Sequence, residues 1–234
     1  MQRIGIIGAM EPEVALLKQQ LAQPRTEQVG PYSFYSGQLA GRNVVLVQSG
    51  IGKVAAALAT SLMIHHFQVD AVINTGSAGG FDAELHIGDV VIGTELCHHD
   101  VDVTAFGYAA GQVPNMPATF LSDPRLVTAA ERSIEKLGVG KTKRGLIATG
   151  DSFMCDPKRI EATRATFPSM LAVEMEGAAI AQVCYQMQVP CVVIRSLSDI
   201  AGKESPESFE AYLAVASKNS SAMVIELLQQ LSAA

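Results

Sequence analysis

The sequence predicts an α/β fold: a single-domain, three-layer α/β/α sandwich around a central mixed, mostly parallel sheet. Short runs rich in β-branched residues end at glycine or serine and alternate with longer stretches rich in alanine, leucine and glutamine. The short runs are continuously apolar, as expected for parallel strands that are covered on both faces. The chain of 234 residues, 48% of them hydrophobic, can bury one sizeable core. No repeat or linker divides it, so we expect one domain over residues 1–234.

The N-terminal half opens with an apolar run that ends at glycine, which predicts a strand over Arg3–Gly8. Apolar residues at helical spacing then predict a helix over Glu11–Leu21, in which Pro12 is tolerated because it falls in the first turn. The short segment Ala40–Arg42 predicts the turn of a hairpin. The other elements expected in this half are the hairpin strands Tyr32–Leu39 and Asn43–Ser49, the helix Gly52–Phe67, and the strands Ala71–Thr75 and Gly88–Cys97.

A long irregular connection is expected over His98–Phe120, where prolines and glycines interrupt every short stretch. Connections of this length in compact domains are usually functional. Helical and strand patterns alternate again beyond it. The expected helices are Pro124–Leu137, Pro157–Thr166, Glu176–Met187 and Phe209–Leu231, and the expected strands are Gly145–Thr149, Leu171–Val173 and Cys191–Ser196.

Composition narrows the class of partner. The net charge of −6 and the absence of a Lys/Arg cluster argue against nucleic-acid binding. No apolar run approaches the roughly 18 residues of a membrane helix, so we expect no membrane association. The N-terminus runs directly into the apolar tract Ile4–Ile7 without a basic leader, which favours a cytoplasmic protein. A small neutral molecule is the expected ligand.

Cysteine and histidine spacing indicates neither a disulfide framework nor a metal site. The cysteines show no C-x-x-C spacing and lie in apolar neighbourhoods, so we expect four buried free thiols, at positions Cys97, Cys155, Cys184 and Cys191. The clusters His65-His66 and His98-His99-Asp100 have no third ligand at a suitable spacing. The sequence therefore predicts no metal.

Ligands of an open α/β sheet bind beyond the carboxyl ends of the strands, so the residues after each strand are the candidate site. Carboxylates occur in four of the six expected strand exits, which are Gly8 to Glu13, Ser49 to Lys53, Thr75 to Gly80, Thr149 to Met154, Val173 to Gly177 and Arg195 to Asp199. The spacing Gly5-Ile6-Ile7-Gly8 is not a dinucleotide fingerprint and no P-loop occurs, so no cofactor is expected. The glycines of Gly76–Gly80 form either a tight turn or a backbone surface for a flat ligand.

Four carboxylates should gather in one cleft without obvious cationic partners. Glu174 and Glu176 stand where a strand meets a helix, a place where acidic residues can also serve only the helix dipole. Glu13 follows the first strand and Asp199 follows the last. Desolvation and neighbouring like charge would raise the pKa of Asp199, so that it remains protonated and can act as a general acid. One acid and one base acting on water constitute the machinery for hydrolysing a bond to a sugar.

Other chemistries fit less well. Ser152 and Ser198 lack the G-x-S-x-G elbow, and no cysteine is paired in sequence with a base. Aromatic residues are more often core than ligand contacts, here Phe106, Tyr108, Phe153 and Phe209. Phe106 and Tyr108 fall in the long connection, where their burial would require a partner.

At its strand exits the sequence resembles the bacterial 5′-methylthioadenosine/S-adenosylhomocysteine nucleosidases of the nucleoside phosphorylase superfamily. The resemblance runs nearly end to end. It rests on the blocks Gly5–Met10 with Glu13, Ser49–Val54, Asn74–Gly80, Asp102–Tyr108, Gly150–Phe153, Ala172–Glu176 and Arg195–Asp199. It implies a nucleoside phosphorylase-like fold, a homodimer, and hydrolysis of 5′-methylthioadenosine, S-adenosylhomocysteine and 5′-deoxyadenosine to adenine and the sugar, without a cofactor.

The resemblance also implies roles for individual residues. Glu13 would position and deprotonate the attacking water, and Asp199 would protonate adenine on its imidazole-ring nitrogen. Glu176 would hold the ribose hydroxyls, and Met175 would pack against the sugar. Further expected substrate-binding residues are Ser77 and Arg195 on the ribose side; Ala78, Gly79, Phe153, Met154 and Ser198 around adenine; Ile51 and Phe209, with Val103 and Phe106 across the dimer interface, along the alkylthio group; and Met10.

The sequence departs from the family pattern at Pro12, where an acidic residue is common, and at Met154, where isoleucine is common. Neither change removes a catalytic group. Two competing functions stay open at this point: a phosphorylase of the same fold, in which phosphate replaces water, and a nucleoside-binding protein without catalysis.

Overall fold

The computed structural model describes residues 1–202 and 205–232. The strands are β1 (Arg3–Gly8), β2 (Ala22–Val29), β3 (Tyr32–Leu39), β4 (Arg42–Gln48), β5 (Ala71–Gly80), β6 (Val90–His98), β7 (Phe120–Leu121), β8 (Thr142–Thr149), β9 (Met170–Glu174) and β10 (Cys191–Ile200). The helices are α1 (Glu11–Gln19), α2 (Lys53–Phe67), the 3-10 turn η1 (Thr104–Phe106), α3 (Pro124–Leu137), α4 (Pro157–Thr166), α5 (Gly177–Met187) and α6 (Ser205–Ser232).

One mixed sheet takes in all ten described strands, which confirms the expected α/β class. Its path runs β10-β6-β8-β9-β5-β1-β4-β3-β2, and β10 also pairs with β5. The strands β5, β9, β8, β6 and β10 therefore close into a ring, and the strands from β1 to β2 extend from it as an open sheet. Closure is possible because β5 changes partners along its length, pairing with β1 over Ala71–Asn74 and with β9 at Gly79 and Gly80.

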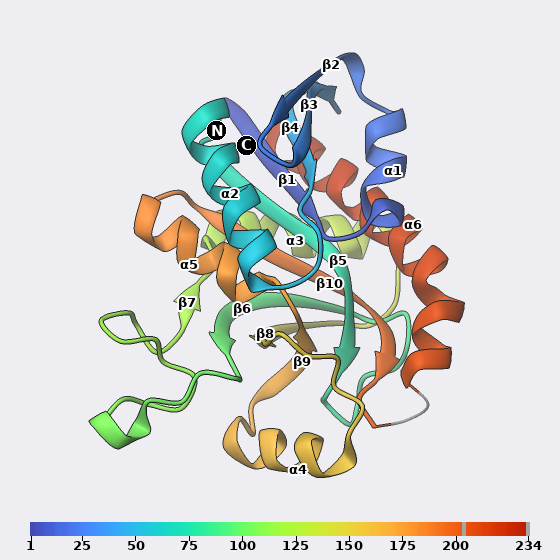
Figure 1. The fold of residues 1–234 in the computed structure, drawn as a ribbon. Coiled ribbons are helices and arrows are strands. Elements are labelled where there is room, and N and C mark those ends of the chain that lie inside the picture. The colour runs from blue at the N-terminus through green and yellow to red at the C-terminus, as the bar shows by residue number, and fades with distance from the viewer. Residues whose placement is uncertain (203–204, 233–234) are drawn as a thin grey trace.

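Helices cover both faces of the sheet (Figure 1). Buried side chains of α2 and α5 form one apolar cluster with the strands, and those of α1, α3 and α6 form the other. Ile6 and Ile73 are fully buried in the second cluster. Burial of each such side chain contributes about 1.5–3 kcal/mol, so the two clusters hold the layers together. A smaller cluster under α4 includes Met154 and Ile160.

The strand β2 was not expected from the sequence. Its residues are mostly polar and all exposed, apart from the half-buried Val29. β2 is an edge strand held by its antiparallel pairing with β3, so it needs no apolar face, and Pro24 is tolerated at an edge. The neighbouring helix α1 is also shorter than expected, ending at Gln19 rather than at Leu21.

The strands β5 and β10 run past their expected ends, from Thr75 to Gly80 and from Ser196 to Ile200. Two of the expected strand exits are therefore strand backbone in parallel register, in which Arg195 pairs with Gly76. The extension of β5 could not be predicted because its last residues are rich in glycine, which weakens strands. The long connection after β6 contains η1 and β7 but is otherwise irregular, as expected.

Three of the four cysteines are buried, but Cys155 is exposed. The expectation for Cys155 was wrong because it lies on the irregular segment before α4 rather than in an element facing the core. All four are free thiols. None of the helices within residues 1–202 and 205–232 is long and apolar enough to cross a membrane.

Candidate active site

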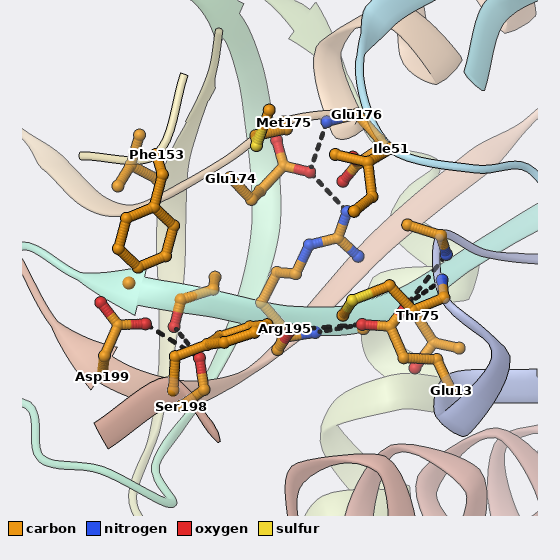
Figure 2. A pocket seen from close by; sticks show the side chains of 18 residues that line it. Glu13, Ile51, Thr75, Phe153, Glu174, Met175, Glu176, Arg195, Ser198 and Asp199 are labelled. Atoms are coloured by element: carbon orange, nitrogen blue, oxygen red, sulfur yellow. Dashed lines mark hydrogen bonds and ion pairs between the residues drawn. The ribbon is translucent and has the colours of Figure 1, made fainter. Parts of the chain in front are cut away.

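A pocket of about 390 Å³ opens at the carboxyl ends of β5, β9 and β10, beside the start of α1 (Figure 2). It brings together residues from all six expected strand exits. The residues that line it are Ala9, Met10, Glu13, Ile51, Thr75, Gly76, Ser77, Ala78, Gly79, Phe153, Val173, Glu174, Met175, Glu176, Arg195, Ser198, Asp199 and Phe209.

Glu13, from the first turn of α1, lies at one end of the pocket and is only 2% exposed. Its Oε2 accepts hydrogen bonds from the backbone N–H groups of Ala9 and Met10, at 2.8 and 3.0 Å. Its Oε1 accepts from the Ser77 N–H at 3.1 Å and from the Ser77 hydroxyl at 3.2 Å. Both oxygens face donors only, and these four contacts hold the carboxyl group in one orientation.

Asp199 lies on the opposite side of the pocket from Glu13, with Arg195 between them (Figure 2). It is 3% exposed, and its Oδ1 accepts a hydrogen bond from the Ser198 hydroxyl at 2.9 Å. The register of β10 against β5 shifts between Leu197 and Asp199. Such a bulge re-aims side chains, and here both Ser198 and Asp199 line the pocket. A buried carboxyl beside an open cavity is suited to donate a proton to a bound ligand.

Two glycines of β5 allow the carboxylates to lie against the strand. A Cβ on Gly76 would be 2.8 Å from Oε1 of Glu13, and a Cβ on Gly79 would be 3.1 Å from Oδ2 of Asp199. Larger residues would displace the acid and the base. The run from Gly76 to Gly80 is thus a close-approach surface rather than a tight turn, and at these two positions the approaching groups are the protein's own carboxylates.

The carboxylates are not without a cation, contrary to expectation. Arg195 is fully buried and donates from Nη2 to Oε2 of Glu174 at 2.5 Å and to Oδ1 of Asn74 at 2.6 Å. Burial opposes ionisation of Glu174, but the charge of Arg195 and hydrogen bonds from Thr149 and Gly177 lower the pKa of this carboxyl. The pairing could not be foreseen because both residues lie on buried strands that are distant in the sequence. Glu174 serves to fix Arg195.

Glu176 follows β9 and begins α5, with its Oε1 accepting the Gly52 N–H at 2.8 Å. Burial and the charge of Glu174 raise the pKa of Glu176 to about 7, against the opposing charge of Arg195 and the Gly52 hydrogen bond. Glu176 can therefore change charge near neutral pH. The helix-dipole interpretation holds in part for Glu174, whose Oε2 accepts the N–H groups of Glu176 and Gly177 at the start of α5 and also binds Arg195. It does not describe Glu176, which faces the pocket.

Apolar side chains shape the rest of the pocket. The rings of Phe153 and Phe209 meet edge to face, with centroids 5.9 Å apart. Met175 and Met10 also line the cavity, and Ile51 is exposed at its rim. A cavity with aromatic walls at the Asp199 side and carboxylates at both ends fits a flat heterocycle joined to a polyol.

Three expected site residues lie outside this pocket. Met154 lines a small adjoining hollow of about 30 Å³ and packs in the α4 cluster. Val103 is half-buried in the long connection, and Phe106 is 82% exposed there. Neither lines the pocket of this chain.

Four lining residues were not expected, namely Ala9, Thr75, Gly76 and Val173. All four belong to blocks that the strand-exit argument had already singled out. Thr75 and Arg195 add two buried donors, the Thr75 hydroxyl and the Arg195 Nε, which have no hydrogen-bond partner among the residues described.

The described part of the chain contains no group of three potential metal ligands. His98 instead bonds through Nε2 to Gln182 at 2.9 Å. Burial lowers the pKa of both His98 and His99, which favours neutral side chains within the fold.

The chain matches the family model described as the phosphorylase superfamily over residues 3–229. It is 62% identical to a 5′-methylthioadenosine/S-adenosylhomocysteine nucleosidase of Pseudoalteromonas translucida, with 98% of each chain covered. It resembles the crystal structure of such a nucleosidase from Colwellia psychrerythraea in complex with adenine, at 58% identity and a TM-score of 0.96, over 98% of this chain and 96% of that one. The Neisseria meningitidis enzyme in complex with methylthio-immucillin-A gives 48% identity and a TM-score of 0.95, with 98% and 99% covered.

Proposed function

The chain belongs to the phosphorylase superfamily and, within it, to the 5′-methylthioadenosine/S-adenosylhomocysteine nucleosidases, and on this premise we propose how its pocket works. The protein is an N-glycosyl hydrolase that cleaves 5′-methylthioadenosine and S-adenosylhomocysteine to adenine and the thioribose sugar. The observation that carries the mechanism is the placement of Asp199 and Glu13 on opposite sides of one pocket. We extend the substrates to 5′-deoxyadenosine, which has the same adenine and ribose.

Asp199 acts as the general acid. Adenine binds at the Phe153 side of the pocket, against the β5 backbone at Ala78 and Gly79. Asp199 gives its proton to the imidazole-ring nitrogen of adenine as the N-ribosyl bond breaks, so that neutral adenine leaves. The Ser198 hydroxyl, 2.9 Å from Oδ1, stabilises the carboxylate that this transfer leaves behind.

Glu13 acts as the base. Its four hydrogen bonds hold the carboxylate in one orientation, with Ser77 supplying two of them. Glu13 orients a water molecule on the face of the ribose opposite to adenine and takes its proton as the oxygen bonds to the anomeric carbon. The developing positive charge on the ribose is stabilised by this anion and by Glu176.

Glu176 binds the ribose hydroxyls, while Met175 packs against the sugar. Two hydroxyl donors favour the ionised carboxylate, so nucleoside binding lowers the pKa of Glu176 from about 7. Affinity is therefore complete above about pH 7 and declines as the pH falls through this value. A KM that rises below neutrality is the kinetic consequence.

Water rather than phosphate is the nucleophile, as the electrostatics of the pocket indicate. Arg195 is the one cationic side chain among the described residues that line it, and Glu174 already holds its Nη2. Glu13 occupies the end where the nucleophile must stand, and a phosphate dianion there would be repelled.

The test is adenine release from 5′-methylthioadenosine by phosphate-free protein, repeated with added phosphate. We expect release without phosphate, free methylthioribose as the product, and no acceleration by phosphate. Release that requires phosphate would identify a phosphorylase. Ligand binding without release in either buffer would identify a nucleoside-binding protein.

The proposal also covers the cellular location, the extent of the domain and the pairing with a second copy of the chain. The four thiols support the cytoplasmic location expected from the sequence. We also propose that residues 1–234 form one nucleosidase domain, because one sheet takes in all ten described strands.

A homodimer would explain an apolar stripe that runs from the turn before α2 into this helix. Ile51, Val54 and Leu58 follow one another at helical spacing and are all exposed, Val54 at 80%. Phe106 is equally exposed on the long connection. Exposed apolar surface of this kind marks an interface, and the partner's Val103 and Phe106 would close the alkylthio side of the pocket.

Val54→Asp is therefore expected to convert a dimer into monomers and to raise the KM for 5′-methylthioadenosine, because the pocket loses its partner wall. Light scattering and steady-state kinetics measure the two effects. The matched control is Val215→Asp, since Val215 is an exposed valine on α6. A monomeric wild type, or dissociation of both variants alike, would contradict the proposed interface.

A further inference from the structure

The turn between β4 and α2, residues 50–53, is held by carboxylates from two other parts of the fold. Oε1 of Glu176 accepts the N–H of Gly52 at 2.8 Å. Oδ1 of Asp151 accepts the N–H of the next residue, Lys53, at 2.7 Å. Two consecutive amides at the start of α2 thus bind two different acidic side chains, one from the catalytic pocket and one from the segment after β8.

Asp151 is itself fixed in place by Asp100. The Asp151 N–H donates to Oδ2 of Asp100 at 3.0 Å, and Nζ of Lys53 donates to Oδ1 of the same carboxylate at 2.7 Å. Asp100 follows β6, so its carboxylate ties together the segments after β4, β6 and β8. Burial opposes ionisation of Asp100, but the Lys53 and Asp151 hydrogen bonds lower the pKa of its carboxyl and keep it charged.

The backbone of the turn is fitted to Asp151. Gly52 has a φ of +97°, and a Cβ on it would lie 3.0 Å from Oδ1 of Asp151. The turn therefore places its backbone against this carboxylate in a positive-φ conformation that residues with a side chain rarely adopt. Ile51, which lines the pocket at its rim, is carried by the same turn.

We propose that Asp151 is a positioning residue for the reaction: by holding the Lys53 N–H, it keeps the Gly52 N–H on Glu176 and Ile51 at the rim of the pocket. Asp151 does not line the pocket, so it acts through the turn. This inference rests on the proposed role of Glu176 in binding the ribose hydroxyls.

The charged groups around Glu176 determine how its pKa changes when the contact between Asp151 and the Lys53 N–H is lost. Glu174 on β9 and Glu13 on α1 raise the pKa of Glu176, whereas Arg195 on β10 and the Gly52 N–H lower it. When the turn loosens, the Gly52 hydrogen bond weakens and the other groups stay in place. The pKa of Glu176 then rises, so that less of it is ionised at neutral pH.

The experiment compares Asp151→Ala with Asp123→Ala, because asparagine would still accept the backbone N–H groups that these carboxylates bind. Asp123 also accepts two backbone N–H groups at the start of a helix, α3, but its own N–H bonds to Cys191, at the end of β10 remote from Asp199. KM and kcat for 5′-methylthioadenosine are measured from pH 5.5 to 9, with Tm as a control. For Asp151→Ala we expect KM at pH 7 to rise about three- to tenfold with kcat changed less, and the rise in KM toward acid to begin at higher pH. Asp123→Ala should lower Tm by about 2–4 °C and leave both profiles unchanged.

The same profiles in a Glu176→Gln background separate the two proposals. There the wild-type acid rise in KM should disappear, and Asp151→Ala should add no further shift. A wild-type profile without an inflection near pH 7 would overturn the role of Glu176. If the wild type shows the inflection near pH 7, and the inflection lies at the same pH in Asp151→Ala as in Asp123→Ala, the positioning role of Asp151 alone would be overturned.

Discussion

Replacement of Asp199 by asparagine is expected to reduce kcat for 5′-methylthioadenosine by about 10²- to 10⁴-fold, the usual contribution of a general acid. Asparagine has the shape of aspartate and can still accept the hydrogen bond from Ser198. It cannot protonate adenine, which would then have to leave as an anion. The nucleoside should bind nearly as before, and calorimetry with 5′-methylthioadenosine measures this in the inactive variant.

The origin of the loss can be tested with a leaving group that needs no proton. A 4-nitrophenyl 5-methylthioriboside releases a stable phenolate, so Asp199→Asn should retain most of its activity on this substrate. Asp156→Asn is a suitable control, because Asp156 caps α4 and lies outside the pocket. Equal losses on both substrates would assign Asp199 a structural role, and unchanged turnover of the nucleoside would remove it from the mechanism.

Ser198 provides a graded companion to this substitution. Its hydroxyl lies 2.9 Å from Asp199 and is also within 3.4 Å of the Ala78 carbonyl. Loss of one hydrogen bond to a charged group is worth about 1.5–3 kcal/mol, so Ser198→Ala should reduce kcat less than the loss of the acid does.

The positions of the acid and the base could be predicted from the sequence because both follow directly from strand exits. Glu13 comes five residues after the end of β1, and Asp199 lies near the end of β10. The carboxyl ends of parallel strands meet at one edge of the sheet, so residues distant in the chain gather there. These two residues could therefore be predicted from the geometry of the fold and not from local propensity.

Features that depend on the pairing of distant buried groups could not be predicted from the sequence. The sequence placed four carboxylates and Arg195 at one site but gave no sign of which carboxylate Arg195 pairs with, whereas the structure couples Glu174 to Arg195 and through it to Asn74. The ring closure through β5 and β10 was missed for the same reason, since it depends on strand register. The edge strand β2 carries no apolar pattern at all, because its stability comes from hydrogen bonds to β3.

Glu13→Gln should likewise reduce kcat by about 10²- to 10⁴-fold, because the amide cannot take a proton from water. Its effect on the site differs from that of Asp199→Asn. All four hydrogen bonds of Glu13 come from donors, so one donor pair must face the amide NH₂ in the variant. We therefore also expect a lower Tm.

An anionic nucleophile separates the loss of the base from the structural loss. Glu13→Ala removes the carboxylate, whose Oε1 would lie 2.8 Å from a Cβ on Gly76, and so leaves space beside this glycine. Azide needs no deprotonation, so it should restore adenine release in Glu13→Ala and yield the 1-azido sugar, while leaving the wild-type rate unchanged. Ser77→Ala is the control, because it removes one of the four hydrogen bonds but keeps the base. If azide restores nothing while adenine analogues still bind Glu13→Ala with the wild-type affinity, then Glu13 does not activate the nucleophile, and the water must be deprotonated by another group of the pocket.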